Sequence, residues 1–349
     1  MNPADHPAFH VRLTADFYDA AGQPKFDDLG LGVFQHSPHV HVSAFPQHQS
    51  VIQSEQLTGC HAALVLSPRV TAQSLQDAHD LLLIARFGVG FDNVDVDACT
   101  ERDVLVSITS GAVDRPVAEA TLGWMIALSH HMLVKDRLVR TGQWDARTRY
   151  MGRELRDRQL GVIGLGGIGR ELVRLLQSFG MQPPIAFDPA LPPHVFSELG
   201  VRPVSLQELL QTSDFVSIHC PLNAHTRNLI GAAELQLMKP EACLLNTARG
   251  GIVDEDALFN ALQNNQIAGA ALDCFAEEPV IQPSRFAQLD NVLLAPHSIA
   301  WTEELFRDIG HTACSGILRT SLGQRPPGVL NPVLFDRPSF RKKWSRWIA

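Results

Sequence analysis

The chain has 349 residues, which is more than most single hydrophobic cores contain and favours two domains. Its 45% hydrophobic and 19% charged residues are typical of a globular protein. A formal net charge of −8 argues against proteins that bind nucleic acid or anionic membranes through general electrostatic attraction.

The cysteines and the first residues of the chain indicate in which cellular compartment the protein is found. The six cysteines are scattered without a CxxC pair, as expected of reduced thiols. The start, MNPADHPAFH, lacks a basic segment followed by an apolar stretch, and no apolar run is long enough for a transmembrane helix. We therefore expect a cytoplasmic protein.

Short apolar runs alternate with helix-like stretches in the first third of the chain. The runs at 62–67, 81–88 and 104–109 predict buried strands, and 71–80 predicts a helix that Thr71 could cap. Upstream, three clustered histidines (His36, His39 and His41) suggest either a metal site or polar residues on a sheet edge. We favour the edge and expect no metal, because no HExxH or Cys/His ligand set accompanies them.

A long helical pattern follows from about 115 to 140, with Pro116 at a first-turn position and a broad apolar face. From residue 160 a second series begins, with strands in LGVIG, PIAFD, DFVSIHC, CLLNTA, GAALDC and NVLLAPH and helices near 168–179, 205–212, 231–238 and 254–264. A last helix near 301–323 precedes a tail rich in proline and arginine. This alternation predicts an α/β protein with parallel sheets.

A glycine-rich loop marks the start of the second series. Gly164, Gly166 and Gly169 have GxGxxG spacing between an apolar strand and an amphipathic helix, which is the context of a dinucleotide-binding loop. The helix N-terminus offers N–H groups and a positive dipole end to a pyrophosphate. Asp188 ends the next strand, 188 − 164 = 24 positions after the first glycine, with no arginine beside it. This favours NAD over NADP, unless Asp188 only caps a helix or lies on the surface.

Polar residues end three later apolar runs: Arg249 in NTARG, Glu278 in LDCFAEEP and His297 in APH. The carboxyl ends of parallel strands are where such sheets bind ligands. An arginine can hold a carboxylate with two parallel hydrogen bonds, and a histidine oriented by a carboxylate can transfer a proton at neutral pH. Together with a nicotinamide, these groups suit hydride transfer at a hydroxy-acid carbon.

With these motifs, and with ARFGVGFDNVD (85–95), the chain resembles the D-isomer-specific 2-hydroxyacid dehydrogenase family. The resemblance implies two doubly wound parallel-sheet domains, with a Rossmann NAD-binding domain (110–298) inserted into a flavodoxin-like substrate domain (1–109 and 299–349). It implies a catalytic Arg249, Glu278 and His297, with Glu278 chosen over Glu277 because it directly precedes proline. The implied substrate-binding residues are Val89, Gly90, Arg249 and His297. The implied cofactor-binding residues are Gly164, Gly166, Gly167, Ile168, Gly169, Asp188, Pro221, Thr247, Ala248, Arg249, Asp273 and His297.

The predicted function is NAD-dependent interconversion of a D-2-hydroxy acid and its 2-oxo acid by a homodimer. The alternative is an NAD(H)-sensing interaction protein of the corepressor type, for which a basic tail around Arg337, Arg341, Lys342, Lys343 and Arg346 could serve. Two segments depart from the family pattern: 109–120, which bears on the shape of the substrate pocket, and HSIAW (297–301), which bears on the position of Trp301. Whether either one alters the pocket stays open at this point.

Overall fold

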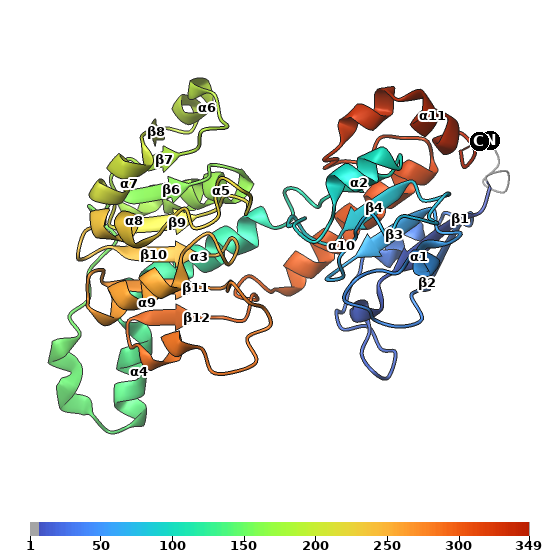
Figure 1. The fold of residues 1–349 in the computed structure, drawn as a ribbon. Coiled ribbons are helices and arrows are strands. Elements are labelled where there is room, and N and C mark those ends of the chain that lie inside the picture. Colours follow the sequence, from blue (N-terminus) through green and yellow to red (C-terminus); the bar gives the residue numbers. More distant parts are fainter. Residues whose placement is uncertain (1–6, 349) are drawn as a thin grey trace. The chain divides into compact units, whose positions relative to one another are not determined.

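Two parallel sheets organise the chain over residues 7–348, which the computed structural model describes (Figure 1). Each sheet belongs to its own compact unit. Unit 1 consists of the chain up to Val113 and from Trp301 onward, and unit 2 is Asp114–Ala300. The predicted α/β class with two parallel-sheet domains is confirmed.

Unit 1 contains a five-stranded sheet in the order β2-β1-β3-β4-β5, the flavodoxin-like order. Its strands are β1 Phe9–Leu13, β2 Val40–Ala44, β3 Ala62–Val65, β4 Leu83–Arg86 and β5 Leu105–Ser107. Its helices are α1 Ser54–Leu57, α2 Val96–Glu101, α10 Glu303–Ser321 and α11 Pro338–Trp344, with 3₁₀ turns at Ala15–Phe17, Leu31–Phe34 and Pro332–Asp336. The three predicted apolar runs contain β3, β4 and β5, which are almost wholly buried because both faces of the sheet are covered.

Two local predictions for unit 1 need comment. The helix expected at 71–80 is wrong, because this segment forms turns. Thr71 and Ser74 exchange side-chain to backbone hydrogen bonds, Thr71 N–H to Ser74 Oγ at 3.1 Å and Ser74 N–H to Thr71 Oγ1 at 3.3 Å, which compete with helix formation. Of the clustered histidines, His41 is exposed on the edge strand β2, whereas His39 is buried and lies 3.0 Å from Ser321 Oγ.

Unit 2 contains a seven-stranded parallel sheet in the order β12-β11-β10-β9-β6-β7-β8. Its strands are β6 Leu160–Ile163, β7 Ile185–Phe187, β8 Arg202–Pro203, β9 Phe215–Ile218, β10 Cys243–Asn246, β11 Gly269–Leu272 and β12 Val292–Leu294. Its helices are α3 Asp114–Ser129, α4 Met132–Arg140, α5 Gly167–Leu176, α6 Pro193–Glu198, α7 Leu206–Thr212, α8 Ala232–Leu237 and α9 Glu255–Gln263, with 3₁₀ turns at Trp144–Arg149, Gln177–Phe179 and Arg285–Gln288.

The single long helix expected at 115–140 is wrong in one respect. The structure has two helices, α3 and α4, with a break between them at His130 and His131. His131 has φ +51°, a left-handed conformation that no α-helix interior contains. Helical periodicity continues across the break, so the sequence pattern did not reveal it.

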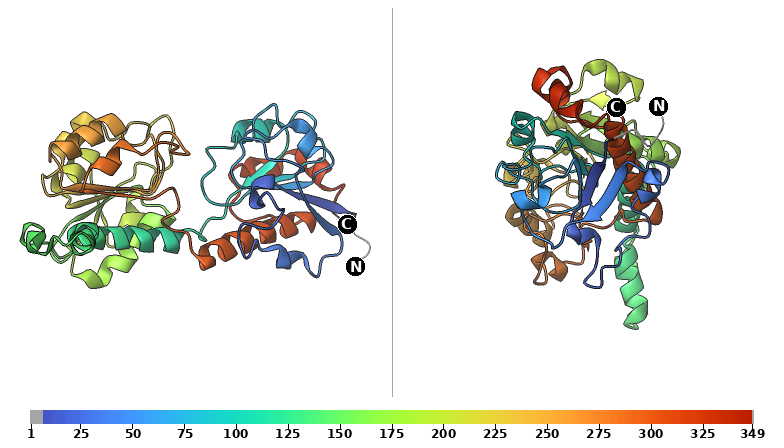
Figure 2. Two further views of the ribbon diagram at one scale, coloured as in Figure 1. Left: turned by 90° about the horizontal axis from the view of Figure 1, so that it is seen from below. Right: turned by 90° about the vertical axis from the view of Figure 1, so that its right-hand side faces the viewer.

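The core of unit 2 has two layers, one on each face of the sheet. Val162 and Leu245 face a layer that includes Leu172 of α5, whereas the alternate strand residue Leu244 packs in the other layer with Leu258 of α9. Figure 2 shows helices on both faces of this sheet. No helix among residues 7–348 is long and apolar enough to cross a membrane.

Candidate functional site

The sequence-predicted site residues of unit 2 follow the carboxyl ends of its strands. Gly164 comes directly after β6, Asp188 after β7, Thr247 after β10 and Asp273 after β11, and His297 lies three positions beyond β12. The strand order reverses where β6 lies between β7 and β9. Sheets of this kind bind ligands in the crevice outside the carboxyl ends at that reversal.

The glycine loop has the backbone that a dinucleotide requires. Gly164 has φ +90°, and a Cβ there would lie 2.6 Å from the Cys220 backbone nitrogen. At Gly169 a Cβ would lie 2.6 Å from the Gly164 carbonyl oxygen. Gly166, by contrast, is the N-cap of α5 and has open space where a Cβ would be. The Gly164 and Leu165 N–H groups donate to the Phe187 carbonyl and to Asp188, so a phosphate would meet the N–H groups at the start of α5.

Asp188 connects this loop to the end of β7. Its Oδ2 accepts a hydrogen bond from the Leu165 N–H at 2.9 Å, and its Oδ1 accepts one from the Ala190 N–H at 3.0 Å. The carboxylate is only half-buried. Its position fits the acid that binds the adenosine ribose in Rossmann domains, and the two hydrogen bonds hold it in place.

His297 and Glu278 form a hydrogen-bonded pair, with Nδ1 2.8 Å from Oε2. The other oxygen, Oε1, accepts the Phe275 N–H at 2.9 Å. Burial would raise the pKa of Glu278, but the hydrogen bonds from His297 and Phe275 and the charges of His297 and Arg249 outweigh burial and lower it. Glu278 is therefore ionised at neutral pH and can only accept, so Nδ1 of His297 carries the hydrogen and Nε2 is left for other chemistry.

Arg249 lies close enough to Glu278 to help lower its pKa. Two hydrogen bonds hold the segment around it: Arg249 Nη1 donates to the Ala248 carbonyl at 2.7 Å, and Asn246 Nδ2 donates to the Arg249 carbonyl at 2.8 Å. The structure thus brings a guanidinium, a carboxylate and an imidazole together in one unit.

The backbone at His297 is unusual. Its φ of +52° is a left-handed conformation, which costs on the order of 1–3 kcal/mol for a residue with a side chain and is often found at functional sites. Asp273 stabilises this turn: its carbonyl accepts the His297 N–H at 2.8 Å, and its Oδ1 accepts the N–H groups of Ser298 at 2.8 Å and Ile299 at 3.1 Å. Burial raises the pKa of Asp273, although these two hydrogen bonds and His297 oppose the shift.

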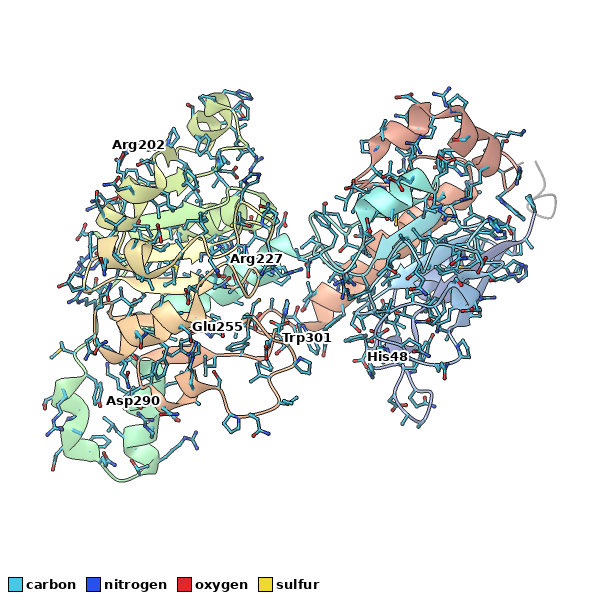
Figure 3. All side chains as sticks on the ribbon, viewed as in Figure 1. His48, Arg202, Arg227, Glu255, Asp290 and Trp301 are labelled. Carbon is cyan, nitrogen blue, oxygen red and sulfur yellow. The ribbon has the colours of Figure 1, made fainter. Side chains whose placement is uncertain are left out.

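Sequence reasoning missed two neighbours of the pair. Glu255, labelled in Figure 3, accepts the Ala276 N–H at 2.6 Å and so fixes the turn that carries Glu278. The buried Cys274 offers a sulfur that, with ligand atoms of Glu278 and His297, forms a group within 4.8 Å, a spacing that could hold a metal ion. The expectation of no metal stays a prediction. The Glu255 contact had no sequence signal, since Glu255 lies 21 positions from Ala276. Cys274 lies within the LDCFAEEP motif, but nothing in the motif singled it out.

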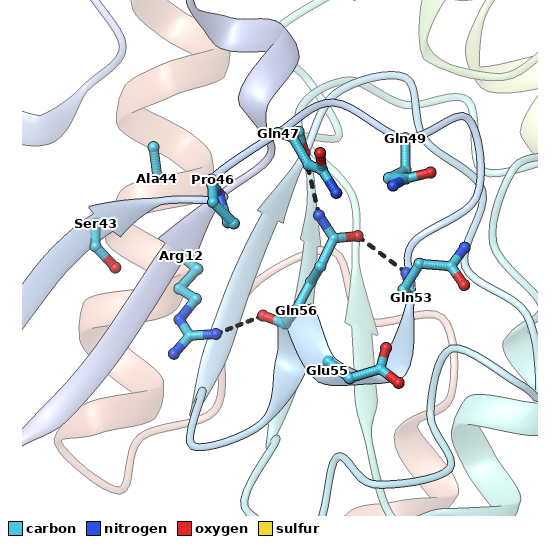
Figure 4. A pocket seen from close by; sticks show the side chains of 9 residues that line it. All are labelled: Arg12, Ser43, Ala44, Pro46, Gln47, Gln49, Gln53, Glu55 and Gln56. Atoms are coloured by element: carbon cyan, nitrogen blue, oxygen red, sulfur yellow. Dashed lines mark hydrogen bonds between the residues drawn. The ribbon is translucent and has the colours of Figure 1, made fainter.

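Val89 and Gly90 lie in unit 1, half-buried in the loop after β4. Arg86 organises this loop: Nη1 donates to the Phe87 carbonyl at 2.6 Å and Nε donates to Asn93 Oδ1 at 3.3 Å. The guanidinium is thus engaged by the protein. Unit 1 also has a cavity of about 510 Å³ between β1, β2 and α1, lined by Arg12 and several glutamines, which contains none of the predicted site residues (Figure 4).

Comparison with known proteins shows which family and which relatives the chain resembles. Residues 122–298 match the family model described as D-isomer specific 2-hydroxyacid dehydrogenase, NAD binding domain. The D-3-phosphoglycerate dehydrogenase of Methanocaldococcus jannaschii is 39% identical over 264 residues, covering 75% of this chain and 50% of that protein. The glyoxylate reductase of Thermococcus litoralis is 34% identical over 281 residues, covering 78% and 84%. The crystal structure of Aquifex aeolicus D-lactate dehydrogenase with NAD and lactic acid has a TM-score of 0.78 at 25% identity, covering 92% and 98%.

The chain spans half the length of this phosphoglycerate dehydrogenase but most of the glyoxylate reductase. The family model covers the glycine loop, Arg249, Glu278 and His297. The chain belongs to the D-isomer specific 2-hydroxyacid dehydrogenase family of nicotinamide-dependent oxidoreductases.

Proposed function

We propose that the protein interconverts a D-2-hydroxy acid and its 2-oxo acid with NAD as cofactor. The observation that carries the proposal is the 2.8 Å contact between His297 Nδ1 and Glu278 Oε2, with Arg249 nearby, beside a dinucleotide-type loop. In hydride transfer at a hydroxy-acid carbon, the protein supplies a proton-transferring acid/base and a group that binds the substrate carboxylate.

Each catalytic residue has a separate task. Glu278 holds the Nδ1 hydrogen of His297, so that Nε2 gives a proton to the C2 oxygen in reduction and takes it back in oxidation. Arg249 binds the substrate carboxylate with two hydrogen bonds. Val89 and Gly90 donate backbone N–H groups to the same carboxylate, a role that rests on the family resemblance. When bound, the nicotinamide supplies or accepts the hydride.

The cofactor is held by unit 2, and NAD is favoured over NADP because the Asp188 carboxylate would repel a 2′-phosphate. Gly166, Gly167 and Ile168 at the start of α5 bind the pyrophosphate. Asp273 is proposed to bind the carboxamide in addition to its contacts at Ser298 and Ile299. The other cofactor-binding positions are those expected from the family resemblance, Pro221, Thr247 and Ala248.

The working form is proposed to be a homodimer formed through the apolar face from Pro116 to Leu133 and the following segment 141–152, whose exposed apolar side chains support this. A location in the cytoplasm and the absence of nucleic-acid and membrane partners stay predictions.

For the alternative function, a corepressor-type NAD(H) sensor, the basic tail was the supporting feature. Much of that tail is engaged within unit 1, with Arg337 3.2 Å from Asp103 and Lys343 bound to the carbonyl of Asp103 at 3.2 Å, which favours the enzyme.

The deciding experiment is NADH oxidation with glyoxylate, hydroxypyruvate, pyruvate, phenylpyruvate and phosphohydroxypyruvate. We expect turnover with at least one of them, and a loss of about 10²–10⁴-fold in kcat for His297→Ala, which removes the general acid. Binding of NADH without turnover of any of these acids would favour the sensor instead.

A further inference from the structure

A second carboxylate lies against the glycine loop, and the GxGxxG motif does not account for it. Asp114 is the first residue of α3, at the point where the chain enters unit 2. Helices α3 and α5 pack against each other, which brings Asp114 to Gly167, the first residue of α5. A Cβ at Gly167 would overlap this carboxylate, lying 2.5 Å from its Cγ and 2.6 Å from its Oδ1. A side chain at 167 would therefore displace the Asp114 carboxylate, which lies 53 positions earlier in the sequence.

Among the described residues, no cation compensates the charge of Asp114. Within residues 7–348 its carboxylate makes neither a hydrogen bond nor an ion pair. The adjacent Arg115 is engaged by Glu119 at 2.9 Å and by Glu171 at 3.3 Å, and Arg170 Nε donates to the Leu165 carbonyl at 2.9 Å. Burial, then the nearby Glu171, raise the pKa of Asp114, as expected of a half-buried carboxylate without a partner.

A dinucleotide brings two phosphate charges to the N-terminus of α5, where Gly166 and Gly167 offer their backbone. We infer that Asp114 is an affinity-setting residue: its negative charge opposes the pyrophosphate and keeps cofactor binding weaker than the glycine loop alone would make it. This deepens the proposed function, because it requires a dinucleotide at this loop. Weaker binding favours release of the oxidised cofactor after each turnover.

The two acids of the cofactor site, Asp188 and Asp114, are expected to act on different parts of the cofactor. Asp188 lies at the end of β7, where the adenosine ribose binds, so it should affect NADPH more than NADH. Asp114 contacts the start of α5 and should affect NADH and NADPH alike, because both carry the same pyrophosphate. ADP-ribose, which has the pyrophosphate and lacks the nicotinamide, should respond as the whole cofactors do.

The test measures the Kd of NADH, NADPH and ADP-ribose for the full chain by titration calorimetry at low ionic strength. Asp114→Asn keeps the shape and removes the charge, so we expect each Kd to fall by about three- to thirty-fold. The gain should shrink near 0.5 M salt, where charges are screened within about 4 Å. Glu241→Gln removes an exposed carboxylate of unit 2 that lies just before β10, at the opposite end of the strand from the glycine loop, and should leave each Kd nearly unchanged.

Asp114→Ser removes the same charge with a smaller side chain and should tighten binding as Asp114→Asn does, which guards against a folding defect in one variant. Unchanged or weaker binding of NADH by both variants overturns the inference and leaves the proposed function standing. Tighter binding of NADH alone, without ADP-ribose, would also overturn it, because the effect would then not act on the pyrophosphate. If no variant, nor the unmodified chain, binds a dinucleotide, the inference and the proposed function both fail.

Discussion

His297 Nδ1 lies 2.8 Å from Glu278 Oε2, while Glu277, one residue earlier, is exposed and makes no hydrogen bond within the described residues 7–348. The two glutamates have the same charge and nearly the same place in the sequence, so their different contacts give a test of the proposed mechanism. The turn that contains both glutamates is held by two hydrogen bonds, from the Phe275 N–H to Glu278 and from the Ala276 N–H to the Glu255 carboxylate.

The first prediction compares Glu278→Gln with Glu277→Gln. Glutamine at 278 keeps the size of the side chain but loses the ionised oxygen that accepts the Nδ1 hydrogen of His297. The imidazole is then no longer held in the form that has Nε2 available for proton transfer, so kcat of reduction should fall. Glu277→Gln should leave kcat unchanged. Measurement of kcat with the best 2-oxo acid checks this, and a fall only in the Glu277 variant would refute the assignment.

Arg249→Lys tests the carboxylate clamp. A lysine keeps the positive charge but cannot form two parallel hydrogen bonds with a carboxylate. Losing one charge-assisted hydrogen bond costs about 1.5–3 kcal/mol, so kcat/KM should fall by about 10- to 100-fold. NADH affinity, measured without substrate, should change little. A variant with unchanged kcat/KM would show that another group binds the carboxylate.

Asp188→Asn tests the cofactor preference. The unmodified protein should have a higher kcat/KM with NADH than with NADPH, because the carboxylate repels a 2′-phosphate. Asparagine keeps an oxygen for the Leu165 N–H and removes the charge, so the ratio of the two kcat/KM values should approach one. Equal use of both cofactors by the unmodified protein would contradict the prediction.

The sequence predicted those parts of the fold that depend on local pattern. Buried runs such as 81–88 became central strands, and the glycine loop could be placed because its spacing and its strand–helix context are both local. A sheet edge was expected near His41, but the bounds of edge strand β2 were not predicted because its side chains are mostly exposed and lack an apolar run. The break at His131 was missed because the helical spacing of apolar residues in the sequence continues on both sides of this left-handed residue.

The candidate site was predictable where the residues follow strands and unpredictable where contacts cross the sequence. Arg249, Glu278 and His297 could be identified from strand ends and family resemblance. Asp114 could not, because its contact with Gly167 arises only when α3 packs on α5. The contact of Glu255, the first residue of α9, with the Ala276 N–H in the turn after β11 could not be predicted either, because it joins distant parts of the sequence.

A fourth prediction concerns acid stability. His61 is 2% exposed, accepts the His10 N–H at Nδ1 at 2.7 Å, and lies beneath the Trp347 ring at a centroid distance of 3.8 Å. Burial, then the charge of His10, lower the pKa of His61 from 6.5 to about 4. Between these values the unfolded chain binds a proton that the folded chain does not, so stability is lost as the pH falls from 6.5 to 4, by at most about 3 kcal/mol.

The variant His61→Asn keeps an acceptor for the His10 N–H and removes the titrating ring. Its urea midpoint should therefore fall less between pH 7 and pH 4.5 than that of the unmodified protein, as followed by tryptophan fluorescence. His48→Asn, at an exposed histidine of unit 1 (Figure 3), provides the matched control and should behave like the unmodified protein. An equal fall in all three proteins would show that His61 does not govern acid stability.

The last prediction is assembly through the arm formed by α4 and the turn at Trp144–Arg149 with its flanking residues. This arm exposes Trp144 at 62% and Met151 at 81%, along with Leu133 and Val139, a larger apolar surface than a solvated segment normally presents. Burying such side chains against a second copy would contribute about 1.5–3 kcal/mol for each one fully covered. Light scattering should therefore give twice the 38.3 kDa mass of one chain.

Trp144→Glu and Met151→Glu place charges in the buried interface and should shift the protein toward monomer. Ile281→Glu changes an equally apolar residue, 84% exposed, in a different loop and should leave the dimer intact. A 38.3 kDa species at all concentrations, or dissociation caused by Ile281→Glu and not by the arm variants, would show that this arm is not the interface.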